Sequence, residues 1–499
     1  MAVQSIVQSG ATVISDKENE NAQYRTAFIV LTSLFFMWGF ITCMNDIIIP
    51  FLKKVFELTR FQSMFVQFAF FGAYFIGSVV YFVISVIWGD PMSKMGYKNG
   101  LIIGLIMSAI ACAMFYPAAE IKQYGLFLTA LFVLGLGFTL LQIAANPYVA
   151  LLGKPETASS RLNLSQAFNS FGTTIAPIIG GYLVFHFFAK MGAPLVNSSG
   201  MQVMTDSGAP MSALGVQLPY LFFAGIFLLL ALLIKLTHLP QFISHEQIEK
   251  GVGALRYPHL VLGMVAIFVY VGAEVSIGSL FINYTRELVN YPEMTSKSYL
   301  AFYWGGAMIG RFLGAISLGD NKSNRSMYIK MFVTSIAAYL LIYGIVYFES
   351  GFTFRIANVT PFLIFLVIQY VGFVIGKSHA GKTLLVFSIV AMALLVITMV
   401  TTGKVALWTV IGIGLFNSIM WSNIFTLAIE KLGQHTSQGS SLLVMMILGG
   451  ALVPMLQGKV ADVMQGYHMS FFIPIICYGY LAYYGWKGHE HKKPIAVAS

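Results

Sequence analysis

Long apolar stretches separated by short polar segments follow one another along the whole chain. The hydrocarbon core of a bilayer is about 30 Å thick, and a helix crosses it with about 20 residues. The pattern therefore predicts fourteen membrane-spanning helices, over residues 27–51, 61–88, 99–118, 124–152, 165–189, 217–238, 259–284, 299–319, 328–348, 360–377, 382–402, 405–432, 438–462 and 469–486.

The composition supports the membrane class. Charged residues make up 10% of the chain, whereas a soluble domain has roughly 25%. The cysteines Cys43, Cys112 and Cys477 all fall within predicted helices, so we expect neither a disulfide framework nor a metal site. No cleavage site follows the first apolar run, so residues 1–24 are expected to be a cytoplasmic tail and not a signal peptide.

The net charge of +10 is distributed unevenly between the two sides of the predicted membrane. With the N-terminus inside, eighteen of the 29 basic residues fall in inner segments and ten in outer segments. This bias follows the positive-inside rule and places both termini in the cytoplasm. The excess positive charge is therefore explained by topology, and we expect no nucleic-acid partner.

An internal repeat relates the two halves of the chain. The residues Asn146, Gly172, Pro177 and Gly181 recur, with identical spacings and an offset of 277, as Asn423, Gly449, Pro454 and Gly458. Both copies run in the same direction, which indicates a parallel repeat such as that of the two halves of major facilitator transporters.

The repeat changes register within the second half. Gly89-Asp90 recurs as Gly319-Asp320 with an offset of only 230, so about 47 residues were gained before Asn423. We interpret the gain as an inserted helical pair. The predicted division is a tail 1–24, a six-helix bundle 25–238, a cytoplasmic loop 239–258, two helices of the second bundle 259–320, the inserted pair 321–380, the last four helices 381–489 and a tail 490–499.

Few ionisable residues lie within the predicted helices: Asp46, Glu274 and Arg311. A charge facing lipid is costly, so each needs a partner or a water-lined cavity and is a functional candidate. Structural pairing is the alternative, and for Arg311 clamping of a neighbouring carbonyl or acid is equally favoured. Gly89, Asp90 and Lys94 form a charged inner loop that we assign, with Arg311, to conformational coupling; a topology signal alone is the alternative.

Amides and tryptophans at membrane depth suit a sugar, because a sugar ring needs hydrogen-bond donors and acceptors and offers an apolar face to aromatic rings. Amides can also simply join helices in a membrane. The candidate substrate-binding residues are Trp38, Asn45, Gln142, Asn146, Gln166, Asn169, Asn417, Trp421 and Asn423. No nucleotide-binding GxxxxGK[ST] loop occurs, which disfavours a primary pump.

Several longer motifs carry a resemblance: FFMWGFITCMNDIIIP, LLQIAANPYVALLG, ETASSRLNLSQAFNSFGTTIAP, YVGAEVSIGS, GLFNSIMWSNIFTLAIEKLG and TSQGSSLLVMMILGGALVP. With them the chain resembles the fucose–galactose–glucose:proton symporter family, and in particular its bacterial glucose/galactose transporters. The resemblance covers nearly the whole chain apart from the inserted pair. It implies a major facilitator fold that binds a sugar between two six-helix bundles and works by alternating access.

The resemblance also implies roles for individual residues. Asp46 matches the family's transport-essential first-helix aspartate, Trp38 its first-helix tryptophan, and Gln166 and Asn169 its fifth-helix amides. L-fucose permease has an acid at the position of Gln142 and an amide at that of Glu274, so an acid and an amide are exchanged here. We hypothesise that Asp46 and Glu274 share the coupling of transport to a proton or to sodium.

The resulting expectation is an all-α bacterial inner-membrane symporter for a hexose, with glucose or galactose favoured and no cofactor or enzymatic activity. A permease for N-acetylglucosamine or L-fucose, or a sugar sensor that does not transport, is the alternative. We expect a monomer whose partners are the sugar, the cation and the bilayer.

Overall fold

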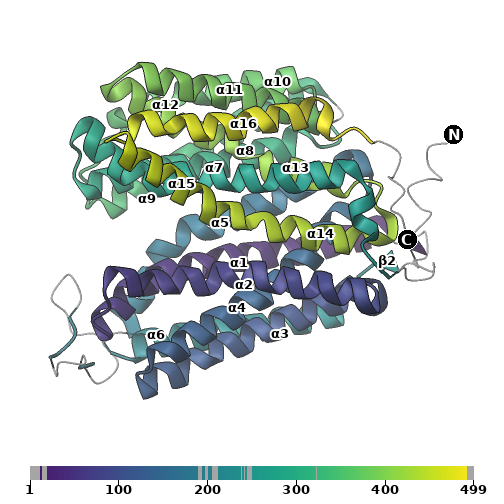
Figure 1. The fold of residues 1–499 in the computed structure, drawn as a ribbon, viewed down its shortest axis with the longest axis horizontal. Coiled ribbons are helices and arrows are strands. Elements are labelled where there is room, and N and C mark those ends of the chain that lie inside the picture. Colours follow the sequence, from purple (N-terminus) through teal and green to yellow (C-terminus); the bar gives the residue numbers. More distant parts are fainter. Residues whose placement is uncertain are drawn as a thin grey trace. The chain divides into compact units, whose positions relative to one another are not determined.

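The computed structural model describes residues 12–13, 20–188, 194–196, 201–204, 212–237, 239–240, 242–243, 250–321 and 323–491. The chain forms two compact units. The first unit comprises Met1–Tyr148 and Phe171–Lys250, and the second comprises Val149–Ser170 and Gly251–Ser499. Each is a bundle of helices (Figure 1).

Six long helices belong to the first half of the chain: α1 (Glu20–Val55), α2 (Arg60–Trp88), α3 (Pro91–Ile121), α4 (Tyr124–Leu151), α5 (Ala158–Tyr182) and α6 (Leu214–Leu236). A π-helical turn, η3 (Leu183–Phe187), follows α5. The strands β1 (Thr12–Val13) and β2 (Phe242–Ile243) form one short antiparallel pair. The first residues of α5 group with the second unit and the remainder with the first.

Ten helices follow: α7 (Pro258–Val289), α8 (Glu293–Ser317), α9 (Asn324–Glu349), α10 (Phe362–Gly376), α11 (Ala380–Val400), α12 (Gly403–Asn417), α13 (Met420–Ile429), α14 (Thr436–Met445), α15 (Gly449–Val463) and α16 (Phe472–Tyr483). Short helical segments lie beside the long helices. They are η2 (Pro155–Thr157) before α5, η5 (Gly253–Arg256) before α7, η6 (Ile356–Asn358) before α10, η7 (Gly433–His435) before α14, η8 (Met446–Leu448) before α15, η9 (His468–Phe471) before α16 and η10 (Tyr484–Gly488) after α16.

Every predicted span coincides with helix in the described part of the chain. Among the residues that the structure describes, ten helical stretches are long and apolar enough to cross a membrane by themselves. The other four spans are α5 and α8, which contain polar residues, and α10 and α16, which have only 15 and 12 residues. Several predicted spans are divided between helical segments: 405–432 into α12 and α13, 438–462 into α14, η8 and α15, 469–486 into η9, α16 and η10, and 165–189 into α5 and η3.

The charged segment after α2 is helical from Pro91 onward, in contrast to the predicted loop. The Asp90 side chain accepts a hydrogen bond from the Met92 N–H at 3.0 Å and so caps α3, and Pro91 occupies its first turn. Proline is favoured at that position because its φ suits a helix start and its missing N–H has no partner there. Lys94 therefore lies on α3, which is kinked at Gly96, where φ is +77°.

The internal repeat has a direct structural counterpart. A Cβ on Gly172 of α5 would lie 2.3 Å from the Phe36 carbonyl oxygen of α1. A Cβ on Gly449 of α15 would lie 2.0 Å from the Phe268 carbonyl oxygen of α7. Both glycines permit the close approach of two helix backbones, a common device in membrane bundles. The repeat landmarks thus mark equivalent contacts within the two units.

The helix packing also bears on the inserted pair. In the first unit α3 packs against α6, and in the second α11 packs against the last helix, α16. This equivalence pairs α11 with α3 and leaves α9 and α10 without a counterpart in the first half. It supports the predicted insertion; the domain boundaries themselves stay a prediction.

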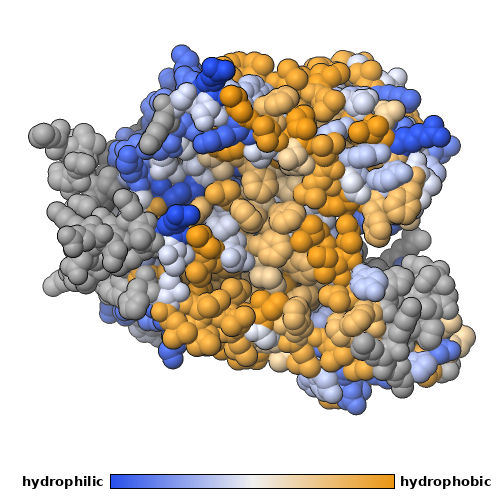
Figure 2. All heavy atoms as spheres, turned by 180° about the vertical axis from the view of Figure 1, so that it is seen from behind, coloured by the Kyte–Doolittle hydropathy of each residue, from blue (hydrophilic) through white to orange (hydrophobic). Residues whose placement is uncertain are grey.

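Both units expose large apolar side chains. Large exposed apolar side chains occur on most helices, for example Phe68 of α2, Phe222 of α6 and Phe332 of α9. In Figure 2 orange side chains cover the middle of the visible face, and blue ones gather towards its left and right edges. A soluble protein rarely exposes so continuous an apolar surface, whereas lipid tails are a suitable neighbour for it.

Candidate functional site

An aromatic and amide cluster lies in the first unit at the candidate residues Trp38 and Gln142. The Trp38 indole N–H donates to the Tyr74 hydroxyl at 3.3 Å, and the Gln142 side chain lies beside the same hydroxyl. Trp38 and Gln142 are 7% and 4% exposed. Asn45 and Asp46 belong to α1, but their side chains lie outside the described part of the structure, so their roles stay predictions.

The second unit contains a buried ion pair between the two remaining charged candidates. Glu274 of α7 is 8% exposed, and its Oε1 lies 3.8 Å from a guanidinium nitrogen of Arg311 on α8. The same guanidinium donates to the Ser418 carbonyl at 3.2 Å and to the Ser170 hydroxyl of α5. Within the described part of the chain Oε1 accepts no hydrogen bond. Arg311 thus both pairs with an acid and clamps a carbonyl.

Among the described residues, further buried side-chain atoms of the second unit have no hydrogen-bond partner. The Tyr270 side chain lies beside Glu274 and Arg311, and its hydroxyl is one of them. The Trp421 indole N–H and the Ser422 hydroxyl of α13 are two others, and α13 packs against α7. Buried polar groups are normally satisfied, so a set of unsatisfied ones indicates a place for water or a polar ligand.

Asn417 occupies a different kind of position from that expected of a sugar ligand. It is fully buried, donates to the Tyr303 hydroxyl at 2.9 Å and accepts from the Tyr478 hydroxyl at 2.6 Å. The Tyr303 hydroxyl in turn donates to the Glu274 carbonyl at 2.9 Å. Asn417 therefore links α8, α12 and α16. Direct sugar contact by Asn417 stays a prediction.

The first part of α5 joins the second unit through polar contacts. The Asn163 amide donates to the Asn423 side chain at 3.1 Å, and Asn423 donates to the Ala380 carbonyl, also at 3.1 Å. Ser160 donates to a carbonyl of α8, at Ala315, at 2.6 Å. These amides hold helices together, which is the alternative the sequence left open for residues of this type.

The remaining candidate amides are also enclosed. Gln166 is 6% exposed and lies, like the partly exposed Asn169, on the part of α5 that groups with the second unit. Asn146 of α4 is fully buried in the first unit. Their expected contact with sugar stays a prediction.

Gly89 and Asp90 connect the C-terminal end of α2 to the start of α3. Gly89 has a φ of +82°, which favours glycine, and the Tyr81 hydroxyl donates to the Asp90 carboxylate at 2.5 Å. The Lys94 ammonium donates to the Trp88 carbonyl at the end of α2. Each contact fixes the α2–α3 junction, so the segment has a structural role; its coupling role stays a prediction.

An ionisable cluster follows α13 outside the membrane-spanning helix. The His491 ring nitrogen lies 3.6 Å from the Glu430 carboxylate, and the His491 ring packs edge-on against His259 at 4.8 Å between centroids. Burial raises the pKa of Glu430 above its usual value. Burial, assisted by Lys431 and His489, lowers the pKa of His491. No group of three or more metal-ligating side chains occurs among the described residues.

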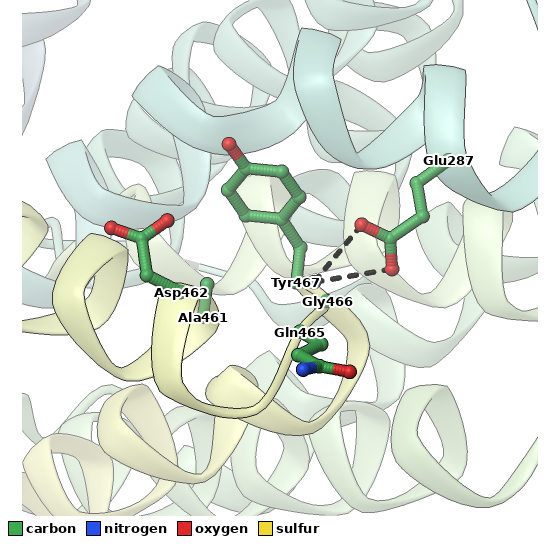
Figure 3. Close-up of a pocket in the computed structure, with 6 residues that line it drawn as sticks. All are labelled: Glu287, Ala461, Asp462, Gln465, Gly466 and Tyr467. Atoms are coloured by element: carbon green, nitrogen blue, oxygen red, sulfur yellow. Dashed lines mark hydrogen bonds between the residues drawn. The ribbon is translucent and has the colours of Figure 1, made fainter.

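A pocket of about 290 Å³ opens at the opposite end of α7, between that helix and the turn after α15 (Figure 3). In Figure 3 the Glu287 carboxylate points at the backbone of Tyr467, whose N–H it accepts at 3.1 Å through each oxygen. Asp462 lies on the other side of the Tyr467 ring. The two acids are exposed, and the pocket contains none of the candidate residues, so we do not assign the sugar to it.

Sequence reasoning missed several residues that the structure brings to the site. Tyr270 could have been found, because it lies one helical turn before Glu274 on the same face of α7. Gln369 of α10, described below, is an amide within a very apolar helix. Tyr303 and Tyr478 carry no such signal, because tyrosines are common in this chain and only the packing selects these two.

The chain matches the Major Facilitator Superfamily over residues 26–454. The chain belongs to this superfamily. It is a multi-pass membrane transporter and not an enzyme. It is 42% identical to a Brucella abortus glucose/galactose transporter, over 94% of this chain and 95% of that one. A putative Helicobacter pylori glucose/galactose transporter is 36% identical over 93% of this chain and 97% of that one.

Solved structures agree with the fold. The Escherichia coli fucose:proton symporter superposes with a TM-score of 0.69 at 30% sequence identity, covering 93% of this chain and 98% of that one. A proton:xylose symporter at 13% identity superposes with a TM-score of 0.57, covering 95% of this chain and 98% of that one. At this identity the likeness concerns the fold alone. The predicted family and all-α major facilitator fold are therefore confirmed.

Proposed function

We propose that the chain imports a hexose, with glucose or galactose preferred, by symport with a cation, with a proton favoured over sodium. The names of its relatives support the sugar, since those that are 42% and 36% identical are glucose/galactose transporters. They also support the ion, since a relative at 31% identity is an L-fucose-proton symporter.

The observation that carries the proposal is the buried, unsatisfied carboxylate oxygen of Glu274. A carboxylate at this depth is costly unless it serves a function, and among the described residues its ion-pair partner is Arg311, 3.8 Å away. An oxygen without a hydrogen bond can accept a proton, a cation or a sugar hydroxyl. The Trp421 indole and the Tyr270 hydroxyl add a stacking surface and two free donors of the kind a hexose needs.

In this proposal Asp46 and Glu274 share the coupling. Binding or losing a cation changes the net charge of a buried site, and a buried charge is far more costly than a neutral group. Because of that cost, we expect the site to close more readily when the cation is bound and the carboxylate is neutralised than when the carboxylate is charged. The sugar would be held by Trp38, Gln142, Gln166, Asn169 and Trp421.

The location follows from the same reasoning. The positive-inside bias supports cytoplasmic termini, and the relatives named above are bacterial. We therefore propose the bacterial inner membrane, and a monomer as the working unit.

Uptake into proteoliposomes tests the proposal. Labelled glucose and galactose are offered under an imposed pH gradient or an imposed sodium gradient, with unlabelled N-acetylglucosamine and L-fucose as competitors. We expect glucose or galactose to accumulate under the pH gradient. Accumulation under the sodium gradient alone would reassign the ion, and stronger competition by N-acetylglucosamine or L-fucose would reassign the sugar. Sugar binding without counterflow would indicate a sensor.

Variants examine the two acids. Asp46→Asn is expected to abolish accumulation, and accumulation at the wild-type level would refute its assignment. Glu274→Gln is expected to lose or alter ion-driven accumulation; if it still concentrates sugar with unchanged ion dependence, the shared-coupling hypothesis fails. Asp462→Asn is the matched control, because Asp462 is an exposed acid of the same unit outside the candidate site.

A further inference from the structure

The helix α10 of the inserted pair buries one face in the second unit. Phe362, Phe365 and Gln369 recur at helical spacing and are 0%, 7% and 0% exposed. Their outward neighbours Ile364 and Val367 are more than 60% exposed. A fully buried amide in a helix this apolar needs a partner, because an unsatisfied polar group at membrane depth is costly.

Glycines of two other helices make room for this face. A Cβ on Gly412 of α12 would lie 2.4 Å from the Phe365 ring. A Cβ on Gly310 of α8 would lie only 2.2 Å from the Gln369 amide nitrogen. The inserted helix is therefore packed into the bundle at close range, and its amide is placed at the junction of α8, α10 and α12.

The Gln369 amide meets the break between α12 and α13. Its Nε2 donates to the Leu415 carbonyl at 2.5 Å and lies 3.4 Å from the Ser418 hydroxyl. The Ser418 hydroxyl donates to the same carbonyl at 2.6 Å, and Arg311 donates to the Ser418 carbonyl at 3.2 Å. The Leu415 and Ser418 carbonyls at the break thus accept hydrogen bonds from side chains of α10 and α8, which compensates for the interrupted helix.

The break separates two candidate residues. Asn417 is the last residue of α12, and Trp421 is the second residue of α13. A change in the backbone at Ser418 and Ile419 would move the Trp421 indole, while Asn417 remains anchored by two tyrosine hydroxyls.

We infer that α10 serves the sugar site: Gln369 is a positioning residue that holds the α12–α13 break and thereby sets the place of Trp421. The inference rests on the proposed function in so far as Trp421 contacts the sugar. It gives the inserted pair a task beyond peripheral packing. Gln369 touches no sugar itself, so its removal acts through α13.

The test compares two neighbouring substitutions on α10. Gln369→Met keeps the length of the side chain and removes the donor at the break. Tyr370→Phe is the matched control, because the Tyr370 hydroxyl donates at 3.0 Å to the Tyr328 carbonyl of α9, within the inserted pair. Gln369→Met removes the hydrogen bonds that Nε2 makes at the break, whereas Tyr370→Phe removes a hydrogen bond of α10 elsewhere.

Binding of labelled glucose and galactose to the purified protein is the first measurement. We expect Gln369→Met to weaken the binding of the preferred sugar by roughly tenfold, the scale of losing a buried hydrogen bond. Tyr370→Phe should stay within about twofold of the wild type. Gln369→Met with wild-type affinity and a reduced melting temperature would show a purely structural role and overturn the inference.

Hydrogen exchange of peptides covering residues 415–425 is the second measurement. We expect faster exchange there in Gln369→Met and unchanged exchange in Tyr370→Phe. If the wild type binds no hexose, the proposed function fails, and exchange still decides whether Gln369 holds the break. Unchanged exchange in Gln369→Met would overturn the inference whatever the sugar result.

Discussion

The buried pair of Glu274 and Arg311 allows a quantitative prediction about stability. The substitution Glu274→Gln leaves the Arg311 guanidinium buried with its contacts to Ser418 and Ser170 but without a counter-ion. At 3.8 Å and an effective dielectric constant of about 20, the lost attraction is about 4 kcal/mol. Removing one partner of a buried pair costs about 3–5 kcal/mol in measured cases, because the other charge stays desolvated.

Replacing both members should cost less than replacing one. The double variant Glu274→Gln/Arg311→Gln has no buried charge, so we expect it to recover a substantial part of the loss. The Glu274 oxygen accepts no hydrogen bond among the described residues, and we therefore place the single-variant cost near the lower value, about 3 kcal/mol. For domains of 150–250 residues this corresponds to a fall in melting temperature of roughly 6–12 °C.

Thermal unfolding of the two single variants and the double variant in one detergent, without sugar, completes a double-mutant cycle. The expected coupling free energy is at least about 1 kcal/mol. Ser170→Ala serves as a control, because it removes one hydrogen bond of Arg311 and changes no charge. The reasoning is refuted if the effects of the two single variants simply add, or if Glu274→Gln unfolds within about 2 °C of the wild type.

Three further predictions follow from individual contacts. Because burial raises the pKa of Glu430, its ionised form opposes folding above the usual pKa; Glu430→Gln should therefore raise the melting temperature at pH 8 and have little effect below about pH 4.5. Gly172→Ala and Gly449→Ala should each lower the melting temperature, since the added carbon meets a carbonyl oxygen at 2.3 and 2.0 Å. Gly344→Ala on α9, with nothing within 4 Å, should stabilise slightly, and the reverse order of these glycine effects would contradict the packing. Trp421→Phe should weaken sugar binding and leave the melting temperature nearly unchanged. An unaltered affinity for the sugar would refute the assignment of Trp421 to the sugar site.

Much of the fold follows from local properties of the sequence. The lengths of the apolar stretches predict the helices, because every backbone polar group in a bilayer must be satisfied within the helix. The recurrence of Gly172 as Gly449 predicts equivalent contacts, because only glycine permits the approach to a neighbouring backbone found at both sites. The cost of a charge facing lipid predicts that Glu274 and Arg311 each need a partner or a water-lined cavity, and the structure adds that they pair with each other.

Tertiary structure decided the rest. The break at Ser418 and Ile419 contains neither proline nor glycine, so the sequence does not predict it. The Leu415 and Ser418 carbonyls there accept hydrogen bonds from Gln369 and Arg311, which come from distant parts of the chain. Asn417 resembles a ligand in sequence, yet two tyrosine hydroxyls from other helices occupy its amide. Amides and carboxylates form hydrogen bonds with any donor or acceptor that the packing places within about 3 Å. The spacing of residues along the sequence does not predict which partner that will be.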